Sequence, residues 1–237
     1  RHSFPTRRSS DLVFARHQTG RGLNKRHVAS DGIAATVFRH GESRALDPHL
    51  HSHAFIFNVT RNAAGRLMAL ESSAIFENTR YLTEVYRNAL AREVQQLGYV
   101  IDRRDHGFEL VGVSPDLLER FSKRAQERDA AIKIREAELG RELTRDEIAL
   151  LVRETRAAKQ YELTPDDVRQ RQLGQVNEGE LAQLHALKSG APGSALPETV
   201  NLNGAIVRAA EHLFERRTVV SEQEFTATVL REAYGGY

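Results

Sequence analysis

Histidines are concentrated near one end of the chain. Six of the ten lie between residues 13 and 60, where an even distribution would place about two; they are His17, His27, His40, His49, His51 and His53. The chain contains no cysteine, so any bound metal must be held by histidine or carboxylate groups. The cluster therefore directs attention to metal chemistry.

Three of these histidines have a spacing that suits one metal ion. His51 and His53 are two residues apart on a predicted strand, so both project from one face with backbone positions roughly 6.5 to 7 Å apart. His40 ends the preceding predicted strand, and an antiparallel pairing would bring its imidazole to the other two. Three nitrogen ligands leave coordination positions open, which is typical of a catalytic metal site. We predict that His40, His51 and His53 bind a metal.

The remaining histidines have simpler explanations. His106, His185 and His212 are interpreted as hydrogen-bonded or surface residues, which is the usual role of an isolated histidine. His49 would face the same side as the ligands but precedes the strand proper. It is left open whether His49 supports the ligands or is simply exposed.

The stretch from His40 to Thr60, HGESRALDPHLHSHAFIFNVT, resembles the metal motif of conjugative relaxases of the MobF type, which belong to the HUH endonuclease superfamily. The family pattern of a histidine, a spacer of ten residues, a His-x-His pair and a later asparagine matches at His40, His51, His53 and Asn58. The resemblance continues to about Lys159, and the segment after Gly204 resembles the junction with a helicase-like part.

This resemblance implies a divalent metal, with Mg, Mn and Zn not distinguished, that polarises a phosphate of single-stranded DNA at a transfer origin while a tyrosine attacks it. The parent protein would be a DNA strand transferase of the bacterial cytoplasm, fused to a helicase and assisted by conjugation accessory and secretion-system proteins, without membrane insertion. In the family the nucleophilic tyrosines and an orienting aspartate precede the first strand of the motif. We therefore expect them upstream of Val13 and expect the fragment alone to be inactive.

Two tyrosines within the chain are alternative candidates for the nucleophile. Other HUH proteins carry the nucleophile on a helix after the motif, which makes Tyr81 and Tyr86 candidates. Both belong to an apolar helical stripe, so packing is the favoured interpretation.

Other functions fit less well. A histidine-triad nucleotide hydrolase would not explain His40, and Ser52 breaks its hydrophobic alternation; a cupin oxygenase would need a glutamate shortly downstream. The main alternative is a metal-bearing module that binds single-stranded DNA without cleaving it.

Basic residues near the motif are candidates for DNA contact. The net charge of the whole chain is only +2, but Lys and Arg outnumber Asp and Glu by six to three between residues 13 and 60. The DNA-binding candidates are Arg16, Arg21, Lys25, Arg26, Arg39 and Arg44.

The composition and the distribution of turn-forming residues suggest how the chain is divided into domains. Its 237 residues, 40% hydrophobic and 28% charged, suit a packed core, and no apolar run approaches the roughly 20 residues of a membrane span. Residues 2–12 resemble the translation of a sequencing adapter, so 1–12 are set aside as an artefact. We expect a partial relaxase domain over 13–160, a helical and flexible connector over 161–203, and the start of a helicase-like region over 204–237.

The expected fold class is α+β, with a central antiparallel sheet that carries the three-histidine site, flanking long helices and a mostly helical C-terminal part. Strands are expected over 33–40 and 49–59, the second of them central and apolar on both faces in its second half, with a hairpin around Gly107. A long helix is expected over 72–97, and capping residues predict further helix starts. These capping residues are Ser114, Thr144, Thr164 and Ser221.

Overall fold

The structure is a computed structural model that describes residues 12–18, 25–30, 32–104, 107–155, 162–189 and 201–235; for 17–18, 25–29 and 188–189 it describes only the backbone. The chain forms two compact units. Unit 1 comprises Arg1–Thr36, Ala54–Val111 and Lys188–Tyr237, and unit 2 comprises Val37–His53 and Gly112–Leu187. No helix in the described ranges is long and apolar enough to cross a membrane.

Small antiparallel sheets make up the β-structure of unit 1. Strand β1 lies between β2 and β7 in one sheet, while β5 pairs with β6 and β8 pairs with β9. Gly107, expected in the loop of the last hairpin, is the first residue of β9 and has a left-handed φ of 127°. The strands are β1 Phe14–Gln18, β2 Lys25–Ala29, β5 Thr60–Arg61, β6 Leu67–Met68, β7 Leu70–Glu71, β8 Ile101–Arg104 and β9 Gly107–Leu110.

The helix expected over 72–97 is divided into α1, Ser73–Glu77, and α2, Thr79–Gln96. Asn78 separates them with a backbone of φ −102° and ψ 19°, and its N–H donates to the carbonyl of Ala74. Gly98 follows α2 with a left-handed φ of 91°, a conformation that commonly ends a helix.

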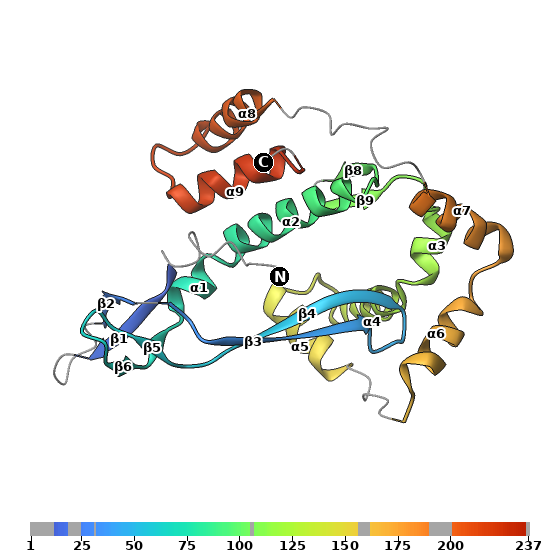
Figure 1. Ribbon diagram of the computed structural model, residues 1–237, viewed down its shortest axis with the longest axis horizontal. Coiled ribbons are helices and arrows are strands. Elements are labelled where there is room, and N and C mark those ends of the chain that lie inside the picture. Colours follow the sequence, from blue (N-terminus) through green and yellow to red (C-terminus); the bar gives the residue numbers. More distant parts are fainter. Residues whose placement is uncertain are drawn as a thin grey trace. The chain divides into compact units, whose positions relative to one another are not determined.

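Two C-terminal helices complete unit 1. Helix α9, Glu222–Glu232, packs along α2, and α8, Leu202–Phe214, packs on α9 (Figure 1). Ser221 caps α9 as predicted, since its hydroxyl accepts from the N–H of Glu224. The core between α2 and α9 contains Leu12, Tyr81, Ala227 and Leu230. Leu12 is thus buried, although it falls in the segment set aside as an artefact.

Most of the larger apolar residues of α8 are only partly buried. Ile206, Val207 and Phe214 are exposed, whereas Ala205 and Ala209 are fully buried against α9. Small side chains allow two helices to approach closely, so the two alanines are the fully buried residues of α8 in this contact, and Leu202 packs against the same cluster.

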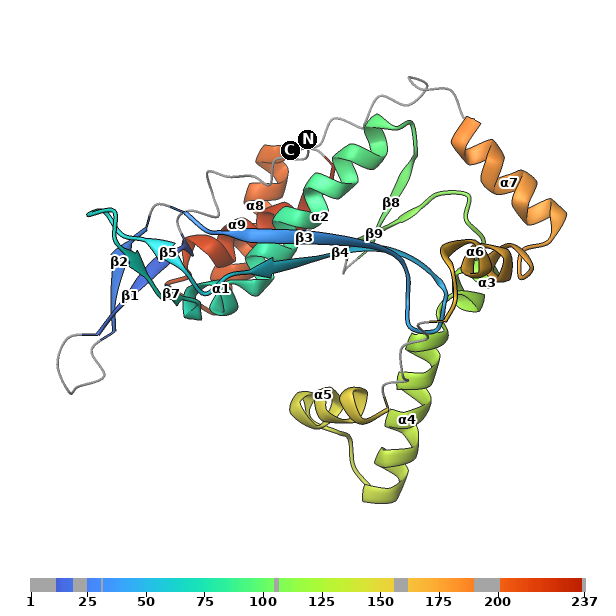
Figure 2. The ribbon, with the colours of Figure 1, turned by 60° about the horizontal axis from the view of Figure 1, so that its bottom comes forward.

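In the part of the chain that the structure describes, unit 2 combines most of a β-hairpin with five helices. Three of the helices begin at predicted caps: Ser114 accepts from the N–H of Leu117, and Thr144 and Thr164 form capping boxes with Glu147 and Asp167. Helix α5 lies beside α4 (Figure 2). The elements are β3 Ala35–Glu42, β4 Pro48–Ile56, α3 Pro115–Arg120, α4 Lys123–Leu139, α5 Arg145–Glu154, α6 Pro165–Leu173 and α7 Glu178–Ser189.

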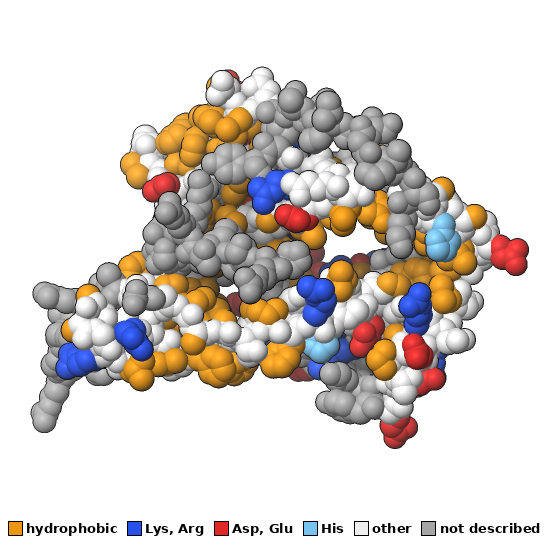
Figure 3. Space-filling view, in the orientation of Figure 1, with side chains coloured by type: hydrophobic (Ala, Val, Ile, Leu, Met, Phe, Trp, Pro, Cys, Tyr) orange, Lys and Arg blue, Asp and Glu red, His pale blue; other side chains and the backbone are white. Residues whose placement is uncertain are grey.

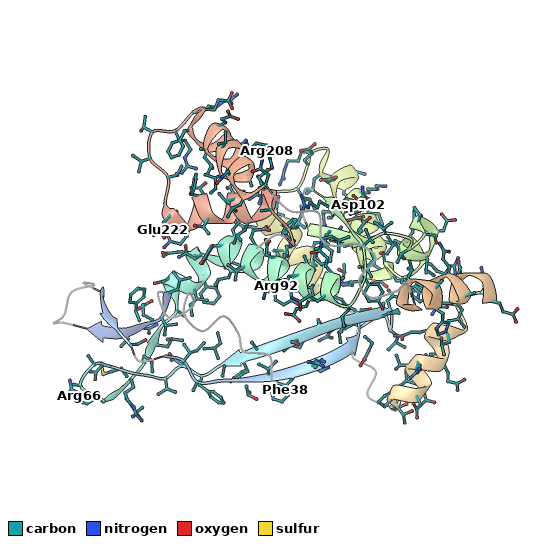
Figure 4. All side chains as sticks on the ribbon, turned by 45° about the horizontal axis from the view of Figure 1, so that its top comes forward. Phe38, Arg66, Arg92, Asp102, Arg208 and Glu222 are labelled. Atoms are coloured by element: carbon teal, nitrogen blue, oxygen red, sulfur yellow. The ribbon has the colours of Figure 1, made fainter. Side chains whose placement is uncertain are left out.

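The α+β class is confirmed, but the expected central sheet is not found among the described residues. Strand β4 pairs with β3 in a two-stranded sheet, and its second half is exposed rather than buried on both faces: Phe55 is 60% and Ile56 37% exposed. Hydrophobic side chains are visible along this hairpin (Figure 3), and Phe38 points away from it (Figure 4). Apolar residues favour burial of a strand, but the strand is buried only where another element packs over it.

Candidate metal centre

The β3–β4 hairpin brings the three predicted ligands together. His40 lies in β3, and His51 and His53 lie in β4, all within unit 2. Residues 43–47 join the strands, and so short a connection requires an antiparallel pair. The sequence folds this way locally because two strand-forming runs flank a polar turn.

The three imidazole rings are mutual neighbours. Ring centroids are 5.4 Å apart for His40 and His51, 5.2 Å for His40 and His53, and 5.0 Å for His51 and His53. Nitrogens about 2.1 Å from one ion at near-tetrahedral angles would place the ring centres roughly 5 Å apart. The side chains therefore have the spacing that a shared metal requires.

One hydrogen bond favours a particular tautomer of His51. Its Nδ1 lies 2.8 Å from the backbone carbonyl oxygen of His49, so a proton on Nδ1 would be donated to that oxygen. The lone pair of Nε2 then remains available to a metal, and such a bond commonly orients metal-binding histidines. The His49 ring stacks on His51 at 4.5 Å, and its exposed position agrees with either role left open for it.

The orientations of the three imidazole rings, unlike their spacing, do not match those of ligands to one metal ion. Across the ranges that the structure describes, no group of three or more His, Cys, Asp or Glu side chains is arranged to hold a metal ion. The planes of His40 and His51 are inclined by 29°, whereas those of His51 and His53 are inclined by 80°. Rotation about side-chain torsions is needed to aim one nitrogen of each ring at a common point. In type and spacing, the three residues fit a divalent metal.

The DNA-binding candidates are in different surroundings. Arg16 forms an ion pair with the buried Glu71, its Nε lying 3.3 Å from the carboxylate, so its guanidinium group already has a structural role. Arg39 is exposed on β3, beside His40 in sequence, and Arg44 lies in the turn after it. Lys25 and Arg26 are in β2 but their side chains, like the whole of Arg21, lie outside the described residues.

The two tyrosine candidates differ in exposure. Tyr81 is 9% exposed and belongs to the core, as the packing interpretation predicted. Tyr86 is 58% exposed, so the same interpretation was wrong for it.

Sequence reasoning missed the residues that hold the turn of this hairpin. Asp47 is 2% exposed and binds Lys123 at the start of α4. A carboxylate directly before a proline is common in turns, and that pattern alone gives no sign of a partner 76 residues away.

The predicted class of protein, a fragment of a MobF-type conjugative relaxase, is confirmed by comparison with known proteins. The family model described as TrwC relaxase matches residues 9–178, which is more than half of the chain. The chain belongs to the TrwC relaxase family.

Relatives and solved structures agree with this assignment. The multifunctional conjugation protein TraI of Escherichia coli is 26% identical over 209 residues, covering 80% of this chain but 11% of TraI. A conjugative relaxase TrwC in complex with mutant oriT DNA aligns with a TM-score of 0.61 and 29% identity, covering 70% of this chain and 59% of TrwC. A copper-bound TrwC complex with oriT DNA gives a TM-score of 0.60 and 28% identity, covering 76% and 58%.

Proposed function

We propose that this chain is the metal-binding part of a conjugative relaxase that nicks single-stranded DNA at a transfer origin, with His40, His51 and His53 as the metal ligands. The observation that carries the proposal is the approach of these three rings to within 5.0 to 5.4 Å of one another on a single hairpin. TrwC structures that contain oriT DNA, one of them copper-bound, support both the DNA partner and the metal.

Each histidine would supply one neutral nitrogen, and the carbonyl of His49 would hold His51 in the required tautomer. When bound, a divalent ion supplies Lewis-acid stabilisation of the negative charge that builds on the phosphate during attack. The nucleophile in this proposal is a tyrosine of the parent protein that precedes Val13. Burial of Tyr81 in a core removes one of the two candidates within the chain, whereas Tyr86 is exposed and is the competing candidate.

The chain spans only a small part of the length of TraI, whose name describes it as multifunctional. We extend the proposal to the whole parent, in which residues 13–160 belong to the relaxase domain, 161–203 connect it onward and 204–237 begin a helicase-like region. Conjugation accessory proteins and secretion-system proteins would be binding partners of this parent protein.

The direct test measures metal binding by the 237-residue chain and by His40→Ala, His51→Ala and His53→Ala variants, using Mn²⁺, Zn²⁺ and Co²⁺ separately. Each substitution should weaken binding by at least about tenfold, since it removes one of three ligands. His49→Ala is the matched control, because it removes a neighbouring imidazole but keeps the carbonyl that orients His51. Unchanged affinity in the His51 and His53 variants would contradict the proposed ligands.

Cleavage is tested in the parent protein with a single-stranded transfer-origin oligonucleotide. Metal-dependent nicking should disappear in the His51→Ala and His53→Ala parents while oligonucleotide binding remains. A parent that binds metal and the oligonucleotide but never nicks it would instead be a DNA-binding module without catalysis.

A further inference from the structure

The turn that joins β3 to β4 determines how His40 faces the other two histidines. The N–H of Ser43 donates to the carbonyl of Asp47 at 2.9 Å, and the hydroxyl oxygen of Ser43 accepts from the N–H groups of Ala45 and Asp47 at 3.2 Å each. Leu46 has a left-handed φ of 63°, which side chains rarely adopt without support from their surroundings.

Asp47 supplies much of that support through α4. Its carboxylate accepts from the backbone N–H of Lys123 at 3.1 Å and from Lys123 Nζ at 2.6 Å. Ser122 makes no side-chain cap at this helix, and its first turn contains no acidic residue. Asp47 therefore caps α4 from a distant part of the sequence, where a negative charge meets the unpaired N–H groups and positive end of the helix dipole.

Two glutamines bind the same region through α6 and the residues after it. Gln172 Nε2 donates to the carbonyl of Leu46 at 2.9 Å, and Gln175 Oε1 accepts from Lys123 Nζ at 2.6 Å. We call Asp47, Lys123, Gln172 and Gln175 the turn clamp. The turn clamp lies within unit 2, the unit that also contains the three histidines.

We propose that Asp47 is a positioning residue for the three-histidine site, an inference that rests on the proposed function. The turn of a hairpin fixes the register in which its two strands pair. A shift of β3 by one residue relative to β4 would place His40 on the face of the hairpin opposite His51 and His53. The hydrogen bonds of Asp47 described above reach Ser43 and Lys123, in the turn and in α4. Asp47 acts through the turn, by keeping His40 opposite His51 and His53.

The test is a Co²⁺ titration of the 237-residue chain, followed by the visible absorption of the bound ion, which reports ligand geometry. Asp47→Ala should weaken Co²⁺ binding by about 10- to 100-fold, as loss of residues that support metal ligands commonly does, and should alter the absorption band. Urea unfolding of the metal-free chain gives the loss of stability separately.

Thr144→Ala is the matched control. It removes the cap of α5 in the same unit and so weakens a helix without touching the turn. Its Co²⁺ affinity and spectrum should equal those of the unsubstituted chain. Lys123→Met is the second variant if Asp47→Ala fails to fold, because it keeps the backbone N–H and an unbranched side chain but removes the ammonium. Its expected effect is a smaller weakening with the same spectral change.

Two outcomes separate this inference from the proposed function. If the folded clamp variants bind Co²⁺ with unchanged affinity and spectrum while His51→Ala does not, Asp47 has no positioning role and the histidine site stands. If His51→Ala also binds like the unsubstituted chain, both proposals are wrong.

Discussion

The hydroxyl of Tyr234 donates a hydrogen bond to a carboxylate oxygen of Glu84, which joins residues 150 positions apart. Tyr234 is fully buried and Glu84 is 5% exposed, while Arg87 Nη1 lies 3.0 Å from the other carboxylate oxygen. Burial and the bond to Glu84 raise the pKa of Tyr234 to about 12, so the hydroxyl keeps its proton at neutral pH. The residues that follow α9 are thereby fixed to α2.

Tyr234→Phe should lower the free energy of unfolding of the chain by about 1 to 3 kcal/mol, because the buried carboxylate loses a donor that nothing replaces. Urea unfolding followed by circular dichroism measures this loss. Tyr86→Phe, on the same helix α2 but exposed, should change the free energy by less than about 0.5 kcal/mol. Equal effects of the two substitutions would mean that the Tyr234 hydrogen bond does not stabilise the fold.

Local sequence signals predicted helix starts well. Ser114, Thr144 and Thr164 cap helices where their spacing from later residues predicts it, since a cap involves only neighbouring backbone N–H groups. The two strands that bring the histidines together were also predictable, because strand and turn patterns are local.

Tertiary relationships were not predictable from those patterns. The contact of Asp47 with Lys123 spans 76 residues, and neither residue type distinguishes a buried pair from a surface one. The exposure of the second half of β4 was not predicted either. Its apolar residues indicate a tendency to be buried, but the sequence pattern does not show which element, if any, packs over them. The metal ligands themselves remain predictions, supported by ring spacing.

Arg39 and Arg16 should respond differently to substitution if the chain binds single-stranded DNA as proposed. Arg39 is exposed, so Arg39→Ala should weaken DNA binding and reduce the slope of log affinity against log salt by about 0.7, the value for one lost phosphate contact. Fluorescence anisotropy with an oligonucleotide at several salt concentrations measures both quantities.

Arg16→Ala is the comparison for Arg39→Ala. It leaves the buried Glu71 carboxylate without the cation 3.3 Å away, so it should reduce the stability of unit 1 and leave the salt slope unchanged. A salt slope that stays constant in the Arg39 variant and falls in the Arg16 variant would reverse this assignment.

The start of α5 should depend on acid pH through Glu147. Its carboxylate accepts from Arg141 and from the N–H and hydroxyl of Thr144, and these bonds lower the pKa from the ordinary 4.5 to about 2. Because the folded-state pKa is the lower one, the stabilisation is fully present above pH 4.5 and is lost as the pH falls toward 2.

Carbon NMR of the Glu147 carboxyl group tests this expectation. The signal should remain that of the ionised form at pH 4.5, where an ordinary glutamate is half protonated. Arg141→Met removes the largest cause of the lowered pKa and should move the midpoint upward. Glu147→Gln should abolish the acid dependence of the protection factor of the Thr144 amide, that is, of its exchange rate relative to an unstructured peptide at the same pH. A midpoint near 4.5 in the unsubstituted chain would show that the bonds from Arg141 and Thr144 do not hold the carboxylate in solution.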